Sequence, residues 1–258
     1  MANKSLNELY SQLVEAAYVD DEKSQRYYLS MVETHRHIPV DYLIKRGCLF
    51  IPNNDYILHY LGKDAMSYGA GLYDGERCNW TMFVLIPIVD LVGDIVGLVG
   101  WDFYNKHREL EEGEKGLPMY KVSSKLTFPR EKYFLSDTKL LRDTFDKRVI
   151  FVVDGVFDSI ALNSRGIPAI SLLGSTISPE ILYYLRWYKN IYTLQDNDSA
   201  GSKMYQRLSK ALPRVNRVFQ NQTKDIEELL RSEPADGPIT TQLLHLVDCP
   251  VEDDYYLY

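Results

Sequence analysis

The sequence is poor in cysteine, and its three cysteines are far apart. Cys48, Cys78 and Cys249 are odd in number, so they do not form a disulfide framework, and their spacing does not match a zinc ribbon. His35 and His37 lie close together without a nearby pair of cysteines or histidines, so no zinc site is expected. We therefore expect three reduced thiols, which is the usual state in the cytoplasm.

Long apolar runs are also missing. The two longest, at residues 83–89 and 95–99, are interrupted by a proline or bounded by aspartates. A membrane-spanning helix needs about 20 consecutive apolar residues, so no membrane association is expected. The N-terminus lacks the apolar centre of a secretory signal peptide. These two absences again favour the cytoplasm.

An excess of basic residues is missing as well. Lys and Arg number 29, against 36 Asp and Glu, which gives a net charge of −7. Nucleic-acid binding needs basic surface to neutralise phosphates, so a surface that is basic throughout is excluded. The acidic residues gather at 20–23, 109–114 and 251–254. A local basic groove is therefore compatible with the overall charge.

The region from residue 149 to residue 201 contains two apolar runs that end in acidic residues. VIFVV at 149–153 precedes Asp154, and NIYTL at 190–194 precedes QDND. Short runs rich in Val and Ile, alternating with helix-length amphipathic segments, are typical of parallel strands buried on both faces. The region predicts an α/β fold with a parallel sheet.

A further apolar stretch, VNRVFQNQ, lies at 215–222. Five acidic residues follow the ends of these three predicted strands: Asp154, Asp196, Asp198, Asp225 and Glu227. Ligands of open α/β sheets bind at the carboxyl ends of the strands, so we expect these side chains to meet at one edge. Carboxylates gathered there repel one another unless a cation binds, and oxygen ligands suit magnesium or manganese. The pattern predicts a metal site that handles phosphates.

Some of these acids also have a purely structural interpretation. Asp198 stands before a helix-length segment and is a candidate N-cap. Asp225 and Glu227 lie at the start of KDIEELL, where the first turn of a helix favours negative charge. The residues alone leave both interpretations open.

The order of these elements resembles the Toprim domain of DnaG-like primases, type IA topoisomerases and some nucleases. That pattern has an acid and a glycine after the first strand, an aspartate four residues after that acid, a glycine turn, and then DxDxAG. Here it reads Asp154-Gly155, Asp158, Gly174 and Asp196–Gly201. The combination is specific, whereas a single DxD is not.

The N-terminal half predicts an α+β lobe ahead of this sheet. Ser5 and Glu8 form a capping-box signature for a first helix, and a second helix is expected at 22–34. Pro39 begins a third, short helix that Gly47 ends. Residues 79–90 and 93–104 then read as two strands joined by a tight turn at Gly93-Asp94.

This lobe extends the resemblance to the RNA-polymerase domain of bacterial and phage-type DNA primases, over residues 40–232. The similar segments are YLIKRG at 42–47, the strand pair, Met119–Ser123 and Phe128–Lys132. The resemblance implies a primase-like lobe at 1–148, a Toprim domain at 149–232 and a C-terminal tail at 233–258.

The resemblance implies template-directed synthesis of short RNA primers on single-stranded DNA from ribonucleoside triphosphates. Two or more magnesium or manganese ions would be held by the five acids named above. Asp154 is then the candidate general base or metal ligand, and Asp158 either a further catalytic residue or one that orients its neighbours. Lys121, Arg130 and Lys132 are the candidates for binding nucleotide or DNA, with a solvated basic loop as the alternative.

The chain departs from the primase pattern at three residues and in what flanks the matched region. Asp154 stands where glutamate is usual, Trp101 replaces an arginine, and Met119 replaces a lysine. We also expect no zinc-binding domain before the matched region, and the family's helical bundle after it to be mostly missing. We expect a compact primase of phage type in a bacterial or infected bacterial cell, aided by a replicative helicase or a separate zinc-bearing protein.

Two other functions remain open. A non-catalytic primase-like module that binds the replisome or nucleic acid also accounts for the departures, and a Toprim nuclease shares the carboxylates but not the N-terminal lobe. The acidic, tyrosine-rich end at 251–258 is either part of a partner contact or a solvated end. Trp80, Trp101 and Trp187 are expected to pack inside the protein.

Overall fold

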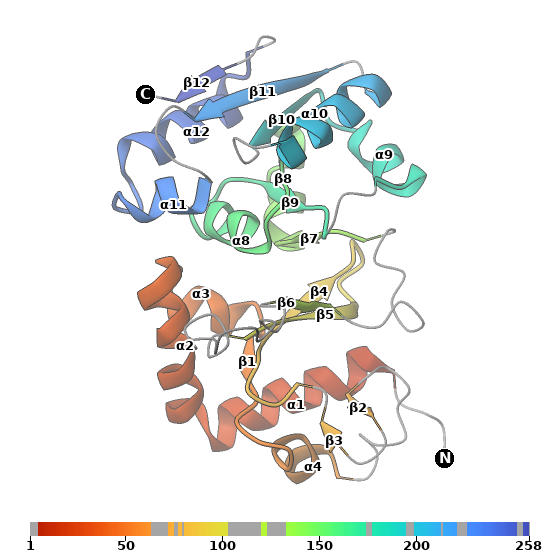
Figure 1. Cartoon of the computed structure of the whole chain (residues 1–258), viewed down its shortest axis with the longest axis vertical. Coiled ribbons are helices and arrows are strands. Elements are labelled where there is room, and N and C mark those ends of the chain that lie inside the picture. The colour runs from red at the N-terminus through yellow and green to blue at the C-terminus, as the bar shows by residue number, and fades with distance from the viewer. Residues whose placement is uncertain are drawn as a thin grey trace, which may run out of the picture. The chain divides into compact units, whose positions relative to one another are not determined.

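The computed structural model describes residues 5–62, 72–74, 77–78, 80–102, 120–122, 133–173, 177–194, 199–212, 214–220, 226–251 and 255–257. The chain forms two compact units. The first comprises residues 1–34 and 39–129, and the second comprises 35–38 and 130–258. Helices and sheets are present in both (Figure 1), so the expected α/β class is confirmed. Residues 130–148, which the motif-based division assigns to the N-terminal lobe, lie in the second unit.

The first unit joins helices to antiparallel strands. Its described helices are α1 (Leu6–Asp20), α2 (Glu22–Arg36, whose last residues belong to the second unit), α3 (Val40–Lys45) and α4 (Tyr56–Leu61). Its main sheet has the order β1-β4-β5-β6, with β1 (Leu49–Phe50), β4 (Val84–Val89), β5 (Ile95–Trp101) and β6 (Tyr120–Val122). A separate antiparallel pair consists of β2 (Tyr73–Asp74) and β3 (Arg77–Cys78).

The predicted capping box at the start of α1 is present. The Ser5 hydroxyl oxygen accepts a hydrogen bond from the Glu8 backbone N–H at 3.2 Å, and the Glu8 carboxylate accepts one from the Ser5 N–H at 2.6 Å. The apolar face of the helix, from Leu6 to Ala17, is buried as the helical spacing predicts. Helices α2 and α3 also begin where the sequence places them.

The connection between β4 and β5 is longer than the predicted two-residue turn. It runs from Asp90 to Asp94, and the pairing shifts register at Ile88/Val89. One carboxylate oxygen of Asp90 accepts the backbone N–H groups of Val92, Gly93 and Asp94, each at 3.0 Å. This aspartate therefore organises a wider loop, in which Gly93 adopts a φ of 105°. The prediction of a tight turn at Gly93-Asp94 was therefore wrong.

A buried glutamine completes the edge strand of the first unit. Gln25 donates to the carbonyl of Phe50 at 2.9 Å and accepts from the Phe50 N–H at 2.8 Å, so its amide pairs with β1 as a strand would. Buried amides need such partners. Trp80 and Trp101 are also buried here, as expected of packing residues. A Cβ on Gly100 would meet the Trp80 ring at 2.8 Å, so the indole packs directly against backbone.

The second unit is built on a sheet of the order β12-β11-β10-β8-β9-β7. Its strands are β7 (Leu135–Ser136), β8 (Val149–Val153), β9 (Ala169–Ser171), β10 (Asn190–Leu194), β11 (Val215–Gln220) and β12 (Tyr255–Leu257). Every neighbouring pair is parallel except β7 with β9. The predicted parallel sheet is therefore confirmed.

Helices cover both faces of this sheet. They are α7 (Thr138–Asp143), α8 (Val156–Ser164), α9 (Pro179–Leu185), α10 (Ser199–Ala211), α11 (Ile226–Arg231) and α12 (Pro238–Asp248), with a 3₁₀ turn at Phe145–Lys147. Figure 1 shows α9 and α10 on one side and α11 and α12 on the other. The central strands β8 and β10 are buried along their whole length, as their continuous apolar runs predict.

The segment after residue 232, expected as a tail, contains regular structure. Helix α12 precedes the edge strand β12, which pairs in parallel with β11 from Val218 to Gln220. The Tyr192 hydroxyl donates to the Val251 carbonyl at 2.7 Å and accepts the Val251 N–H at 2.8 Å. Both contacts tie the end of the chain to the central sheet.

Leu257 is 2% exposed, so we expect Leu257→Ala to lower the free energy of unfolding by about 2–5 kcal/mol, the range for buried leucines. Urea denaturation followed by circular dichroism measures the change. Val251→Ala is the matched control, because Val251 is 36% exposed. An effect of Leu257→Ala below about 0.5 kcal/mol, as at surface positions, would mean that β12 does not stabilise the sheet.

No disulfide joins the three cysteines; Cys48 and Cys78 are buried and Cys249 is exposed. Burial raises the pKa of the Cys48 thiol to about 12, which keeps it protonated. None of the helices in the described part of the chain is long and apolar enough to cross a membrane.

Candidate functional site

Three neighbouring parallel strands end at the same edge of the second unit's sheet. In register, Asn190 of β10 lies beside Val149 of β8, and Ile191 lies beside Val215 of β11. The carboxyl ends of β8, β10 and β11 are therefore adjacent, at the kind of edge where open α/β sheets bind ligands. Asp154 directly follows β8 and is half-buried there.

The backbone at Asp154 is held by the neighbouring strand. The Ser171 hydroxyl at the end of β9 donates to the Asp154 carbonyl at 3.2 Å, and the Leu172 N–H donates to the Val153 carbonyl at 3.4 Å. These contacts fix the point at which the chain leaves β8, and with it the origin of the Asp154 side chain. The sequence did not single out Ser171, because a small polar residue at a strand end carries no specific signal.

Gly155 and Asp158 occupy the turn from β8 into α8. Gly155 is the N-cap of α8, and Asp158 lies in the first helical turn with only 7% of its surface exposed. A Cβ on Gly155 would lie 1.9 Å from the Asp158 carboxylate, so only glycine permits this carboxylate to lie against the backbone. The first turn of a helix favours negative charge. Asp154 and Asp158 therefore lie at one turn, and their catalytic roles stay a prediction.

The side chains of the other predicted metal ligands lie outside the described part of the chain. Asp196, Asp198 and Asp225 lie outside the described residues, and Glu227 is described in its backbone within α11 but not in its side chain. Strand β10 ends at Leu194, shortly before the aspartate pair. Among the described residues there is no cluster of three metal-ligating side chains. The five-carboxylate site stays a prediction.

The predicted basic residues are also described only in part. Lys121 lies in β6 opposite Gly100 of β5, with its side chain outside the described part. Arg130 and Lys132 lie outside the described residues altogether. Their role in binding nucleotide or DNA also stays a prediction.

One of the three tryptophans is not where the sequence predicts. Trp187 is 52% exposed, whereas we expected it to pack inside the protein. Helix α9 ends at Leu185, and the short connection to β10 begins outside the core, with Trp187 in edge contact with Tyr183 at 6.3 Å between ring centres. The hydrophobicity of tryptophan predicts burial, so it does not reveal that this residue lies in an exposed connection.

Comparison with known families identifies the second unit. A model described as Toprim-like matches residues 151–230. Over 180 residues the chain is 29% identical to the DNA primase of Rickettsia felis, an alignment that covers 65% of this chain and 29% of that protein. The chain thus spans less than a third of the length of the curated relatives it matches.

Solved structures extend the similarity to both units. A DNA primase domain from Pseudomonas aeruginosa matches with a TM-score of 0.68 and 26% identity, over 89% of this chain and 75% of the other. The zinc-binding and RNA-polymerase domains of the Aquifex aeolicus primase match with a TM-score of 0.71 and 19% identity, over 93% of this chain and 59% of the other. The chain therefore has the fold of the primase catalytic core, and its residues 151–230 match the Toprim-like family.

Proposed function

We propose that this protein is a DNA primase, which synthesises short RNA primers on single-stranded DNA by metal-dependent nucleotidyl transfer. The observation that carries the proposal is the extent of the structural match. It covers 89% of the chain or more in primase catalytic cores and includes both units. A Toprim nuclease would account for the second unit but not for the first.

The reaction joins two nucleotides. The 3′-hydroxyl of one attacks the α-phosphate of the next, an oxygen–phosphorus bond forms, and pyrophosphate leaves. Two magnesium or manganese ions would lower the pKa of the attacking hydroxyl and neutralise charge on the leaving group. Asp154 fits such ions, because it supplies hard oxygen atoms directly after the end of β8.

The residues have separable roles in this proposal. Asp196 and Asp198 would hold the metal, with Asp225 and Glu227 as further ligands. Asp154 would serve as ligand or as general base for the 3′-hydroxyl. Asp158 would orient the turn, since its buried carboxylate already lies against Gly155.

A second candidate is a non-catalytic primase-like module. Trp101, which stands where the primase pattern has an arginine, is fully buried and cannot replace that arginine's contact with a phosphate. Asp154 is also one methylene shorter than the usual glutamate. The two candidates differ in one measurement: incubation with single-stranded DNA, labelled ribonucleotides and magnesium or manganese. Short labelled RNA supports the primase, and its absence with both metals, under conditions where DNA binds, supports the module.

Partners follow from the same chemistry. A protein with a net charge of −7 gains little from releasing counterions on bare DNA. We therefore propose that the isolated chain primes poorly and that a replicative helicase or a separate zinc-bearing protein stimulates it.

Lys121, Arg130 and Lys132 are proposed to bind the template or the incoming nucleotide. We expect the triple alanine variant to weaken DNA binding, or to raise the nucleotide concentration needed, by about tenfold or more. If all three contact single-stranded DNA, the slope of log K against log salt should fall by about 2, because each phosphate contact contributes about 0.7. Fluorescence anisotropy over a range of salt concentrations measures this slope.

The matched control replaces Lys23, Lys139 and Arg142 with alanine, because all three are exposed on helices outside the predicted groove. Equal effects of the two triple variants would show that only overall charge matters. An unchanged affinity and slope in the first variant would remove these residues from the binding site.

A further inference from the structure

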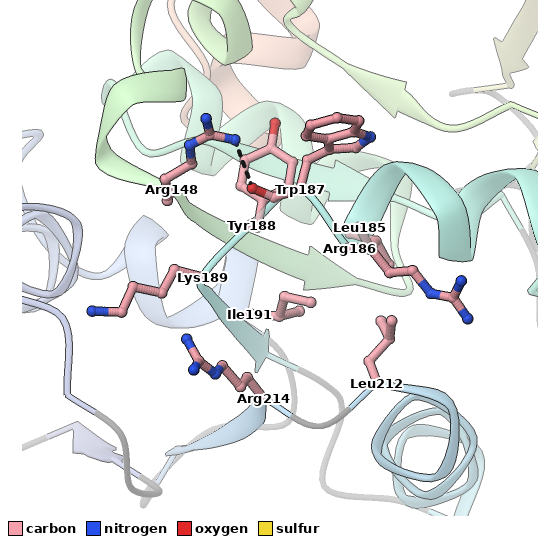
Figure 2. Close-up of a pocket in the computed structure, with 9 residues that line it drawn as sticks. All are labelled: Arg148, Leu185, Arg186, Trp187, Tyr188, Lys189, Ile191, Leu212 and Arg214. Atoms are coloured by element: carbon pink, nitrogen blue, oxygen red, sulfur yellow. Dashed lines mark hydrogen bonds between the residues drawn. The ribbon is translucent and has the colours of Figure 1, made fainter.

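A second site candidate lies at the opposite edge of the parallel sheet. A hollow of about 520 Å³ opens there, lined by Arg148, Leu185, Arg186, Trp187, Tyr188, Lys189, Ile191, Leu212 and Arg214 (Figure 2). This volume is within the range of ligand-binding pockets. Four of the nine lining residues are cationic and none is acidic, although the whole chain is acidic.

The topology of the sheet gathers these cations. Arg148 directly precedes β8, Lys189 directly precedes β10, and Arg214 directly precedes β11. These strands are neighbours and parallel, so their amino ends are adjacent. Arg186 follows the end of α9. In Figure 2 the side chains of Lys189 and Arg214 extend to one side of Ile191, and that of Arg186 extends to the other.

The cations of the hollow remain available to a ligand. None of the four forms an ion pair within the described part of the chain, whereas Arg26, Lys139 and Lys147 do. Arg186, Lys189 and Arg214 are exposed. Arg148 is held in place, because its guanidinium donates to the Trp187 carbonyl at 2.9 Å and lies 4.1 Å from the centre of the Phe145 ring.

An aromatic ring accompanies the charges. Trp187 is 52% exposed, and Tyr183 contacts it at its edge without covering it. The interior of the hollow is apolar, with Leu185, Ile191 and Leu212 buried beneath it. A flat aromatic surface beside arginines is the combination that binds bases by stacking and phosphates by charge.

We propose that this hollow is a second binding site for single-stranded nucleic acid, separate from the carboxylate edge. Strand β8 has five residues, so the two edges lie about 16 Å apart at the usual rise per residue. One base would stack on Trp187, and successive phosphates would contact Arg186 on one side and Lys189 and Arg214 on the other. The proposal does not depend on primer synthesis.

Two other ligands are less suited to the hollow. An acidic peptide would satisfy the four cations but would leave the exposed indole without a stacking partner. A mononucleotide would use the indole but would offer only one phosphate to the cations on the two sides of Ile191. A strand uses both features, because it presents a base and several phosphates together.

The test is a titration with oligothymidylate, followed by tryptophan fluorescence, without metal or nucleotides. Trp80 and Trp101 are buried, so quenching reports Trp187. We expect quenching at low salt, and a dissociation constant at least tenfold higher in the Arg186→Gln/Arg214→Gln variant. The salt slope should fall by about 1.4, since two single-strand phosphate contacts are lost. In anisotropy, Trp187→Leu should weaken binding and Trp187→Phe should largely restore it.

The control variant Lys23→Gln/Arg142→Gln removes the same charge at exposed positions outside the hollow and should bind as the wild type does. The proposal is overturned if the Arg186→Gln/Arg214→Gln variant behaves as the control does. It is also overturned if thymidine monophosphate binds as tightly as the oligonucleotide, which indicates a mononucleotide site, or if polyglutamate quenches Trp187 more strongly, which indicates a peptide site. Loss of primer synthesis in the Asp154 variants leaves all these readouts unchanged.

Discussion

Replacing Asp196 or Asp198 with asparagine is expected to abolish primer synthesis while the protein stays folded. The substitution keeps the size of each side chain and removes the negative charge that a divalent cation needs. Loss of a residue that merely supports a metal ligand lowers metal affinity or activity by about 10–100-fold, so loss of a ligand should reduce synthesis by at least about 100-fold. The measurement is the rate of labelled primer formation at saturating magnesium.

Asp146→Asn is the control for this experiment, because Asp146 is an exposed acid in the 3₁₀ turn, before the amino end of β8. It should prime at the wild-type rate. Two results contradict the metal mechanism: near-normal synthesis by Asp196→Asn and Asp198→Asn, or wild-type synthesis that persists in excess EDTA.

Asp154→Ala is expected to eliminate primer synthesis. Asp154→Glu should retain it, and should raise its rate if the short aspartate side chain limits how well the carboxylate reaches the metal or the 3′-hydroxyl. The reason is geometric: Asp154 leaves the sheet at a point fixed by the Ser171 hydroxyl, so only the side chain sets how far the carboxylate extends. Glutamate adds one methylene and keeps the charge. Single-turnover rates with a preformed primer end separate this effect from template binding.

The melting temperature must be compared in the same variants, because Asp154 is half-buried. Both should unfold close to the wild type. If the alanine, glutamate and wild-type proteins have equal turnover, this position is not catalytic, and the non-catalytic module becomes the better description of the site.

Local sequence signals predicted the elements of the fold well. The capping box of α1 and the apolar runs of β8 and β10 are short-range patterns, and each reflects a contact or a burial state that the structure contains. The parallel arrangement followed from continuous apolar runs, because only strands covered on both faces have them. Such patterns are fixed by residues within a few positions of each other.

Features that depend on distant residues were not predictable in the same way. The loop at Asp90 is wider than expected because one carboxylate binds three backbone N–H groups. Strand β12 was expected as a tail, because its short acidic and aromatic sequence carries no clear period. Its pairing depends on β11, far away in the chain.

The two candidate sites also differ in whether a local sequence pattern or the arrangement of distant strands brings their residues together. The carboxylates at 154, 196 and 198 follow predicted strand ends within a recognisable pattern, so the sequence alone makes them candidates. Arg148, Arg186 and Arg214 are ordinary surface cations in the sequence, and only the strand order makes them neighbours. The exposure of Trp187 likewise depends on where α9 ends.

The short strands at the two borders of the second sheet also protect the protein from self-association. An unpaired border strand offers a row of backbone N–H and C=O groups to other chains. Here β7 has two residues and β12 has three, so each border offers few such groups. β12 pairs with the carboxyl half of the six-residue β11, from Val218 to Gln220. A chain without β12 would expose all of β11, and its loss would favour aggregation as well as unfolding.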